Sequence, residues 1–417
     1  MKRFLAVAVC VLLVFFNVLP IYAYADAAPR IISETAVLID AESGQVLYNK
    51  DMDKVMYPAS TTKVLTGLLA VELGDMNDVL TASYEALIPV GSSSHIALAV
   101  DEQITLEQAM YAMSIESAND AANVIGEYIS AKANKPLGQL MNERAKQAGA
   151  KNSNFVNASG LPDDNHYTTA YDLAMITRER VKYDLFNTIF SAETYAMPGT
   201  NLKSQERVFH SQNWYINGVT PCEGLVMSKV GWTEEAAHTM VTCCERDGLK
   251  LICVVMKSIN RADKWKDTTA LLDWAYSNYK RISFTGQYIA LSADEEMSID
   301  KKGRLYVKKS DLVCPDVSIF LTKGDDDRGI RFNFTNPDIS EDLSTVTFDV
   351  EIYTGRWATK NVLATVKATA KVSERSAEYV ATYARMSLLS DLAMVVIFGI
   401  LTFTAAMISD VLLNKRI

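Results

Sequence analysis

The chain has little histidine and no long run of lysine or arginine. Its 417 residues include 4 histidines and carry a formal net charge of -9. An acidic chain without a basic run is not typical of a nucleic-acid-binding protein. The histidines are scattered without the short spacing of metal ligands, so we expect no metal and no cofactor. They are His95, His166, His210 and His238.

Cysteine is also sparse. The chain has 6 cysteines, and Cys10 lies in an apolar N-terminal run. The odd number and irregular spacing of the other five are not typical of a disulfide framework. Neighbouring residues on a strand point to opposite faces, so Cys243 and Cys244 should separate. We interpret the five mainly as small buried residues: Cys222, Cys243, Cys244, Cys253 and Cys314.

Charged residues are missing from a run near the N-terminus. Lys2-Arg3, the apolar run Phe4–Val18 and then Ala23-Tyr24-Ala25 have the three parts of a secretory signal peptide. We therefore predict a signal peptide over residues 1–25 and an exported protein. An uncleaved anchor is the alternative, but the run is shorter than the roughly 20 residues that a membrane span needs.

A second uncharged run lies near the C-terminus. Leu392–Ser409 would form a helix of about 27 Å, close to the roughly 30 Å hydrocarbon core of a membrane. It is apolar on all sides, which favours spanning the membrane over lying on it, and a buried soluble helix is the weaker alternative. We predict a transmembrane anchor over residues 386–413. Lys415-Arg416 just beyond the run favours a cytoplasmic C-terminus, which together with an exported N-terminus would leave the main domain of the chain outside.

The most informative motif is Ser60-Thr61-Thr62-Lys63, directly before the apolar run Val64–Leu73. Residues three apart on a helix share a face, so Ser60 and Lys63 can meet as a nucleophile and its base. The base needs a lysine pKa lowered from about 10.4 by burial or a nearby cation. Ser277-Asn278-Tyr279-Lys280 has the same spacing without signs of chemistry, so this motif alone is not specific.

Ser117-Ala118-Asn119 interrupts a helical pattern over Leu106–Ile129. Polar groups held in such a layer need partners, and a substrate can supply them. A solvated helix face or a local cap is the structural alternative. Ser211-Gln212-Asn213 has the same spacing, so this motif also needs support from the others.

Lys229-Val230-Gly231-Trp232 ends a strand-like run from Gly224, before another run over His238–Cys244. A lysine beside a glycine on a strand offers a charge for an anion and an open backbone edge for a peptide. An ordinary hairpin would look similar, and Lys301-Lys302-Gly303 is a comparable triplet. The order and spacing of all three motifs therefore carry the argument.

Together the motifs resemble those of the D-alanyl-D-alanine carboxypeptidases, low-molecular-mass penicillin-binding proteins related to serine β-lactamases. That family combines Ser-x-x-Lys, Ser-x-Asn and Lys-Thr-Gly boxes. The resemblance covers roughly residues 33–280 and extends to four further segments. These are Ala36–Asp40, Ser43–Tyr48, Asn157–Pro162 and His166–Asp172.

The resemblance implies a mixed α/β (α+β) catalytic domain with a helical subregion over residues 33–280. It implies a serine carboxypeptidase that acts on peptidoglycan stem peptides ending in D-Ala-D-Ala and is acylated by β-lactams. The nucleophile would be Ser60, the base Lys63 and the proton relay Ser117. A catalytically weak wall-binding scaffold and a β-lactamase-like hydrolase are the alternatives.

The resemblance also implies substrate contacts. Asn119 would grip the peptide amide, and Lys229 and Lys264 would attract the carboxylate. The backbone of Gly231 and Trp232 would border the peptide, with the N–H groups of Ser60 and Trp232 binding the oxyanion. One position departs from the family, because Val230 replaces a Thr or Ser whose hydroxyl helps to hold the carboxylate.

Residues 281–375 have a different pattern from the preceding part of the chain. Short segments alternate apolar with polar residues and are separated by turn residues, which predicts a small all-β domain. Family analogy makes this domain a spacer or a partner surface. The predicted strands are Arg304–Val307, Val317–Leu321, Ile330–Phe334, Thr345–Tyr353 and Val362–Ala370.

Overall fold

The computed structural model describes residues 27–300, 305–323, 329–354, 361–373 and 376. The predicted signal peptide and the predicted anchor lie outside these residues. Among the residues described, no helix is long and apolar enough to cross a membrane. The chain forms two compact units. One contains the chain up to Arg281 together with Phe320–Asp325, and the other contains Ile282–Ile319 and the chain from Asp326 onward.

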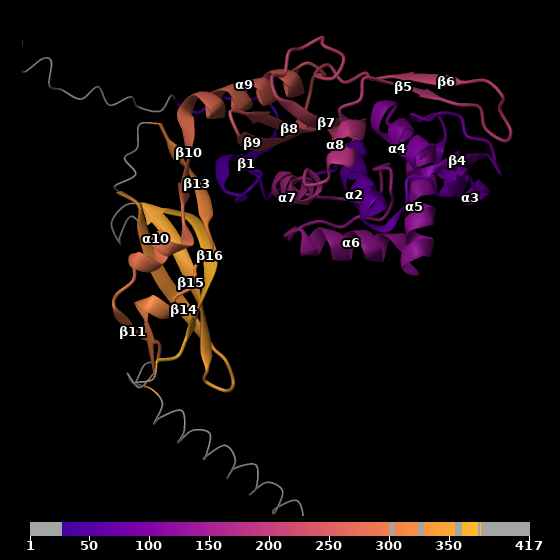
Figure 1. The fold of residues 1–417 in the computed structure, drawn as a ribbon. Coiled ribbons are helices and arrows are strands. Elements are labelled where there is room, and N and C mark those ends of the chain that lie inside the picture. Colours follow the sequence, from indigo (N-terminus) through magenta and orange to yellow (C-terminus); the bar gives the residue numbers. More distant parts are fainter. Residues whose placement is uncertain (1–26, 301–304, 324–328, 355–360, 374–375, 377–417) are drawn as a thin grey trace, which may run out of the picture. The chain divides into compact units, whose positions relative to one another are not determined.

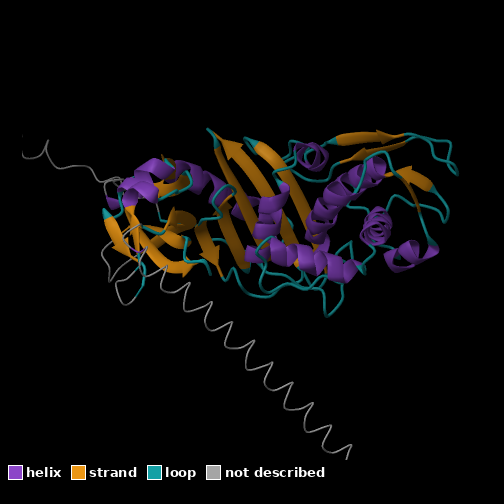
Figure 2. Ribbon diagram, turned by 60° about the horizontal axis from the view of Figure 1, so that its bottom comes forward, coloured by secondary structure: helices purple, strands orange, loops and turns teal. Residues whose placement is uncertain are grey.

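The first unit is built on a five-stranded antiparallel sheet in the order β2-β1-β9-β8-β7. Helices cover both faces (Figure 2), so the middle residues of its central strands are buried on both sides of the sheet. The predicted N-terminal hairpin forms the first two strands. The five strands are β1 (Thr35–Asp40), β2 (Val46–Lys50), β7 (Leu225–Thr233), β8 (Ala237–Arg246) and β9 (Leu249–Ser258).

The two faces of this sheet pack against different helices. On one face Val241 and Cys243 join a core formed with the helical region, whereas Cys244 on the other face joins a core formed with α9 (Asp263–Asn278). The predicted separation of the two neighbouring cysteines is thereby confirmed. Figure 1 shows α9 running along its face of the sheet.

The helical region supplies most of the residues around the candidate site. The predicted helical run over Leu106–Ile129 consists of two helices, α4 (Leu106–Ile115) and α5 (Asn119–Ala133). Between them Ser117 has a φ of 55°, a left-handed conformation that ends the first helix. The other helices of the region are η1 (Ala59–Thr62), α2 (Lys63–Leu73), α3 (Tyr84–Leu87), η2 (Ile88–Val90), α6 (Leu137–Gln147), α7 (Ala170–Arg180) and α8 (Asp184–Phe190).

Two short hairpins lie in the same region. One pairs β3 (Val79–Thr81) with β4 (Gln103–Thr105), and the other pairs β5 (Thr194–Met197) with β6 (Arg207–His210). Residues 91–102 form the loop that leads from η2 into β4. This loop matters for the site because it contacts the start of α5, where the Ser94 carbonyl oxygen accepts from the Asn119 N–H.

The second unit consists mainly of strands, as the alternating pattern predicted. A three-stranded antiparallel sheet and a small hairpin enclose a separate apolar core. The prediction of an all-β domain left out the short helix α10 (Gly286–Leu291) and the 3-10 turn η3 (Lys309–Asp311). The strands are β11 (Glu296–Ser298), β12 (Tyr306–Lys308), β14 (Arg331–Ile339), β15 (Thr345–Thr354) and β16 (Asn361–Lys371); β10 (Tyr279–Phe284) and β13 (Val317–Thr322) contain the unit boundaries.

Candidate active site

Ser60 lies in the short helix η1, where the backbone is strained. Ala59 just before it has a φ of 50°, which is costly for a residue with a side chain. Gly160 packs so closely that a Cβ there would lie 1.9 Å from the Ala59 carbonyl oxygen. A glycine is therefore required at position 160 to hold the turn that presents Ser60.

His166 supports the same turn from behind. The Val156 N–H donates to His166 Nδ1 at 3.1 Å, and His166 Nε2 lies 2.8 Å from Thr62 Oγ1. Since Nδ1 accepts, the proton of the neutral ring is on Nε2 and is donated to Thr62. Burial lowers the pKa of His166 to about 4, so the ring is neutral at pH 7. This histidine is a hydrogen-bonded support for η1.

Lys63 is fully buried and points at Ser60. Its Nζ lies 2.6 Å from Asn119 Oδ1, 2.5 Å from the Ser159 carbonyl oxygen and 2.9 Å from Ser60 Oγ. The amide and the carbonyl oxygen can only accept hydrogen bonds. A neutral amine has two hydrogens, which these two acceptors take up. Its lone pair is then directed at the Ser60 hydroxyl, as a general base requires.

The electrostatic surroundings favour the neutral form of Lys63. Burial, followed by the positive charge of Lys229, lowers its pKa well below the usual value, and Asp120 opposes this shift. A lysine that acts as the base for Ser60 needs such a shift, and burial and the Lys229 charge are its causes. Without them a lysine at pH 7 would be protonated and unable to accept the serine proton.

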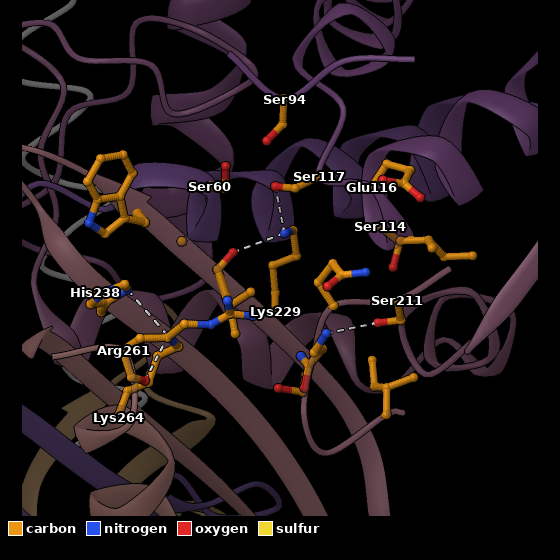
Figure 3. Close-up of a pocket in the computed structure, with 18 of the residues that line it drawn as sticks. Ser60, Ser94, Ser114, Glu116, Ser117, Ser211, Lys229, His238, Arg261 and Lys264 are labelled. Carbon is orange, nitrogen blue, oxygen red and sulfur yellow. Dashed lines mark hydrogen bonds between the residues drawn. The ribbon is translucent and has the colours of Figure 1, made fainter. Parts of the chain in front are cut away.

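Lys229 and Ser117 form a second pair. Lys229 is also buried, and its Nζ donates to Ser117 Oγ at 2.9 Å and to the Val230 carbonyl oxygen at 3.0 Å. Burial lowers the pKa of Lys229 to about 7. The left-handed backbone of Ser117 turns its hydroxyl toward this lysine, as Figure 3 shows.

Strand β7 passes directly beside Ser60. A Cβ added at Gly231 would lie 2.8 Å from the Ser60 backbone nitrogen and 2.5 Å from Thr239 Oγ1. The glycine therefore allows the strand to approach η1, and only this residue type fits without displacement. Trp232 follows with its side chain 62% exposed, above a cavity of about 390 Å³ that Ser60, Ser117 and Lys229 also line.

Three basic side chains gather in the wall of this cavity (Figure 3). Lys264 Nζ lies 3.4 Å from His238 Nδ1 and 3.2 Å from the Arg261 carbonyl oxygen. Burial, and then the Arg261 charge, lowers the pKa of Lys264 to about 8, while burial and the two cations lower that of His238 to about 4. Among the residues the structure describes, no carboxylate forms an ion pair with Lys264 or Arg261. The cluster is suited to an anionic ligand.

Asn119 is buried and is held on both sides. Its Oδ1 accepts from Lys63, its Nδ2 donates to Ser93 Oγ at 2.7 Å, and its backbone N–H donates to the Ser94 carbonyl oxygen at 2.8 Å. The contacts shown are thus with Lys63 and with the loop over residues 91–102. This loop is a part of the site that the motifs did not indicate.

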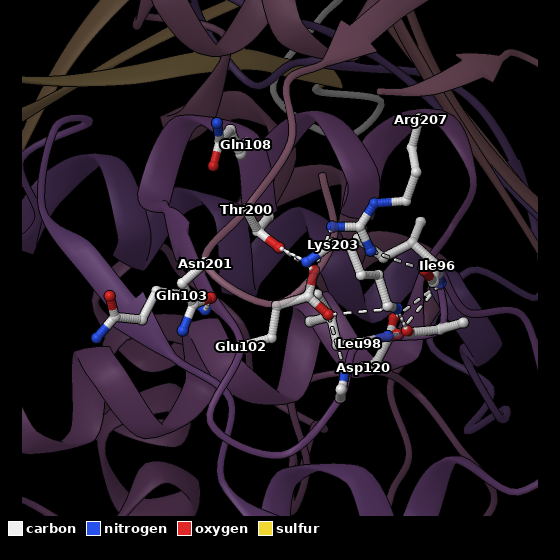
Figure 4. A network of polar contacts seen from close by, with 12 residues as sticks. Ile96, Leu98, Glu102, Gln103, Gln108, Asp120, Thr200, Asn201, Lys203 and Arg207 are labelled. Atoms are coloured by element: carbon white, nitrogen blue, oxygen red, sulfur yellow. Dashed lines mark hydrogen bonds and ion pairs between the residues drawn. The ribbon is translucent and has the colours of Figure 1, made fainter. Parts of the chain in front are cut away.

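A buried carboxylate fixes that loop to the β5–β6 hairpin (Figure 4). Glu102 accepts from Arg207 at 2.5 Å and from Thr200 Oγ1 at 2.9 Å, and Lys203 lies 3.3 Å away. Asp120, next to Asn119, accepts from the backbone N–H groups of Ile96 and Leu98. The loop therefore reaches Asn119 in a defined position.

The three sequences that share the spacing of the motifs have different outcomes in the structure. Ser277 lies at the end of α9 and Lys280 lies in β10, so these two residues do not share a helix face. Ser211 and Asn213 line the same cavity as Ser60, although sequence reasoning gave them no role. Arg261 and His238 were missed as well: the fold brings His238 beside Lys264, whereas Arg261 lies only three residues before Lys264. The triplet at residues 301–303 lies outside the described residues.

Comparisons with known proteins agree with this geometry. A family profile described as D-alanyl-D-alanine carboxypeptidase matches residues 23–260. D-alanyl-D-alanine carboxypeptidase DacF of Bacillus subtilis (strain 168) is 31% identical over 257 residues, which are 60% of this chain and 63% of that protein. The matched part therefore spans a little under two thirds of that relative.

Two crystal structures extend the comparison to the fold. The D-alanyl-D-alanine carboxypeptidase from Mycobacterium tuberculosis H37Rv aligns with a TM-score of 0.54 at 26% identity, over 61% of this chain and 94% of that one. DacD from Francisella tularensis aligns with a TM-score of 0.64 at 19% identity, over 85% of this chain and 97% of that one.

The chain thus has the mixed α/β fold of the DD-peptidases. More specifically, it belongs to the D-alanyl-D-alanine carboxypeptidase family, because the family match covers more than half of its length. The resemblance inferred from the three motifs is confirmed. The individual roles of the site residues stay predictions.

Proposed function

We propose that the protein is a serine-type D-alanyl-D-alanine carboxypeptidase that removes the terminal D-alanine from peptidoglycan stem peptides. The observation that carries this proposal is the buried Lys63 amine. Its two N–H groups are taken up by Asn119 and Ser159, and its lone pair is left for Ser60. Family membership supports the same reaction.

In the acylation step, Ser60 Oγ attacks the carbonyl carbon between the two D-alanines while its proton passes to Lys63 Nζ. The negative charge that develops on the carbonyl oxygen needs two fixed donors. We assign these to the backbone N–H groups of Ser60 and Trp232, because Gly231 brings β7 against the Ser60 backbone nitrogen. The carbon–nitrogen bond then breaks, and water later releases the shortened peptide.

The leaving amine must gain a proton as this bond breaks. Ser117 is placed to relay it, since its hydroxyl is held by Lys229 at 2.9 Å. Asn119, by its contacts with Lys63 and Ser93, orients the base, and a substrate amide would take the place of Ser93 on its Nδ2. Lys229 would thus have two roles: it holds the Ser117 hydroxyl that relays the proton, and its charge helps to lower the pKa of Lys63.

The carboxylate of the terminal D-alanine would bind at the basic cluster. Lys264 and Arg261 carry charge there, and the cavity holds them without a carboxylate partner from the described residues. Val230 cannot donate the hydrogen bond of the family's Thr or Ser, which in a charged pair is worth about 1.5 to 3 kcal/mol. The basic cluster would therefore provide most of the recognition of the carboxylate.

The first prediction concerns the pH dependence of acylation. The base works only when it is neutral, so the rate falls as pH drops through the Lys63 pKa. Replacing Lys229 with methionine removes the cation that lowers this pKa, so the pKa rises and the acid limb of kcat/KM moves to higher pH. The matched control Lys229→Arg keeps the positive charge, so the acid limb of its kcat/KM profile should stay at the wild-type pH. Profiles that coincide for wild type and Lys229→Met would contradict this role.

The second prediction tests Val230 against the scaffold alternative. Val230→Thr should restore a donor and speed acylation by penicillin several-fold, since about 1.4 kcal/mol corresponds to a factor of ten and desolvation of the hydroxyl removes part of the gain. Stopped-flow or gel-based acylation rates of the full-length proteins measure the effect. If the protein is a scaffold without catalytic activity, neither the wild type nor Val230→Thr should be acylated. A wild type that already acylates rapidly, with no gain from threonine, would show that Lys229, Lys264 and Arg261 suffice.

The β-lactamase alternative differs in its second step. Efficient hydrolysis of a penicilloyl-enzyme needs a dedicated base for water, and none was apparent in the sequence. We expect a fluorescent penicillin to stay bound to Ser60 for much longer than the free enzyme needs for one turnover of a D-Ala-D-Ala peptide. Release of hydrolysed penicillin as fast as that of D-alanine would favour the β-lactamase.

We also propose that the catalytic domain lies outside the cytoplasmic membrane, anchored by residues 386–413. The apolar C-terminal run and the N-terminal signal pattern support this placement. As a third prediction, removal of residues 386–417 should release an active protein into the medium, because the site lies wholly within residues 33–280. If the truncated protein stayed in the membrane fraction, an uncleaved N-terminal anchor would be indicated instead.

A further inference from the structure

Two cysteines that are distant in the sequence meet beside the active-site sheet. Cys222 precedes β7 and Cys244 lies in β8, and their Sγ atoms are 3.1 Å apart. The ladder holds them there, because Leu225 pairs with Cys244 and the Glu245 N–H donates to the Gly224 carbonyl oxygen at 2.7 Å. A disulfide is about 2.0 Å long, so an approach of about 1 Å would join the two sulfur atoms.

The backbone that follows Cys222 allows the two cysteines to lie this close. Gly224 has a φ of 70°, and a Cβ at this position would lie 1.9 Å from the Glu245 carbonyl oxygen. The turn that brings Cys222 over β8 therefore depends on a glycine. The separation of 22 residues closes a loop of ordinary size for a disulfide.

We propose that Cys222 and Cys244 form a disulfide when the folded protein meets a disulfide donor. The earlier interpretation of the cysteines as mainly small buried residues still fits Cys243 and Cys253. Cys243 points to the opposite face of the sheet, and Cys253 is fully buried. Cys314 belongs to the second unit.

The two thiols differ in a way that sets the order of reaction. Cys222 is partly exposed, and the hydrogen bond from Cys244 and then the Arg246 charge lower its pKa. Cys244 is buried, and its pKa is raised by that hydrogen bond and by burial. The thiolate is the reacting form, so Cys222 is the residue that attacks an external disulfide.

The chemistry balances with a low-molecular-mass or protein disulfide as the oxidant. The Cys222 thiolate attacks one sulfur of the donor, forming a mixed disulfide and releasing one thiolate. Cys244 then loses its proton and attacks the Cys222 sulfur, which releases the second thiolate. Two electrons pass to the donor, and the protein loses two thiol protons.

The bond would fix one wall of the cavity. Residues 211–224 connect β6 to β7, and Ser211, Asn213 and Ile216 in this segment line the cavity. The segment is already held by Trp214, which stacks on Trp265, and by the Tyr215 hydroxyl, which donates to the Trp265 carbonyl oxygen at 3.0 Å. A disulfide would attach its far end to β8.

The test uses the full-length protein with oxidised glutathione as the donor, so its outcome does not depend on where the protein resides or on whether the proposed reaction occurs. Alkylation followed by peptide mass mapping should show the loss of two thiols and one peptide pair joined through Cys222 and Cys244. The midpoint of thermal unfolding should rise by about 5 to 10 °C over the reduced protein, because a cross-link of this span constrains the unfolded chain.

Two variants serve as controls. Cys222→Ser should lose both the cross-linked peptide and the rise in the unfolding midpoint, whereas Cys314→Ser should keep both. A Cys222 that stays as a glutathione adduct, that remains a free thiol, or that pairs with a cysteine other than Cys244 would overturn the proposal. Mapping the wild type gives this answer even if a variant folds poorly.

Discussion

Replacing Ser60 with alanine should abolish both the release of D-alanine and covalent labelling by a fluorescent penicillin. In the proposed mechanism one hydroxyl performs both reactions, and it lies 2.9 Å from the amine that would take its proton. Loss of a nucleophile from such a unit lowers kcat by a factor on the order of 10⁴ to 10⁶. Alanine matches the serine side chain apart from one oxygen, so the unfolding midpoint should change little.

A matched control is available in the same cavity. Ser94 also lines this cavity. Its contact with the site is made by its backbone carbonyl oxygen, which accepts from the Asn119 N–H, and not by its side chain. Ser94→Ala should therefore keep labelling and turnover. Labelling that persists in Ser60→Ala, or that disappears equally in Ser94→Ala, would refute the assignment of the nucleophile.

The second large effect distinguishes the two buried lysines. Lys63→Arg should be nearly inactive although it keeps its charge, because a guanidinium is not deprotonated in proteins and cannot accept the serine proton. We expect a loss of on the order of 10³-fold or more. Lys229→Arg should retain much more activity, because the proposed role of Lys229 needs a positive charge and a hydrogen-bond donor to Ser117.

The pH profile separates loss of the base from a merely structural defect. An enzyme whose base cannot be deprotonated stays inactive at every pH, whereas an enzyme with a distorted site keeps the shape of the wild-type profile at a lower level. Equal losses of activity in Lys63→Arg and Lys229→Arg, with pH profiles of unchanged shape, would contradict the assignment of Lys63 as the base and Lys229 as the cation beside it.

Spacing and alternation predicted those parts of the structure that depend on local geometry. Residues three apart meet on a helix, so the contact between Ser60 and Lys63 followed from the sequence. Alternation on a strand similarly separated Cys243 from Cys244. The polar residues Ser117-Ala118-Asn119 were seen to interrupt the helical pattern over Leu106–Ile129, but the division into α4 and α5 and the left-handed backbone between them were not predicted.

Contacts between distant segments could not be predicted in this way. His238 lies 26 residues before Lys264 and meets it only because β8 and α9 pack together, whereas Arg261 is a local neighbour three residues before Lys264. Ser93 reaches Asn119 through a loop that a buried Glu102 holds in place. The Cys222–Cys244 contact depends on strand register, which the irregular cysteine spacing does not reveal.

The most direct test of the account is mass spectrometry of a stem peptide ending in D-Ala-D-Ala after incubation with the full-length protein. A serine carboxypeptidase that acts through Ser60 removes the terminal alanine from the peptide, releases free D-alanine in equal amount, and carries a penicillin adduct on Ser60. An unchanged peptide, or cleavage at a different bond, from a correctly folded protein would contradict this mechanism.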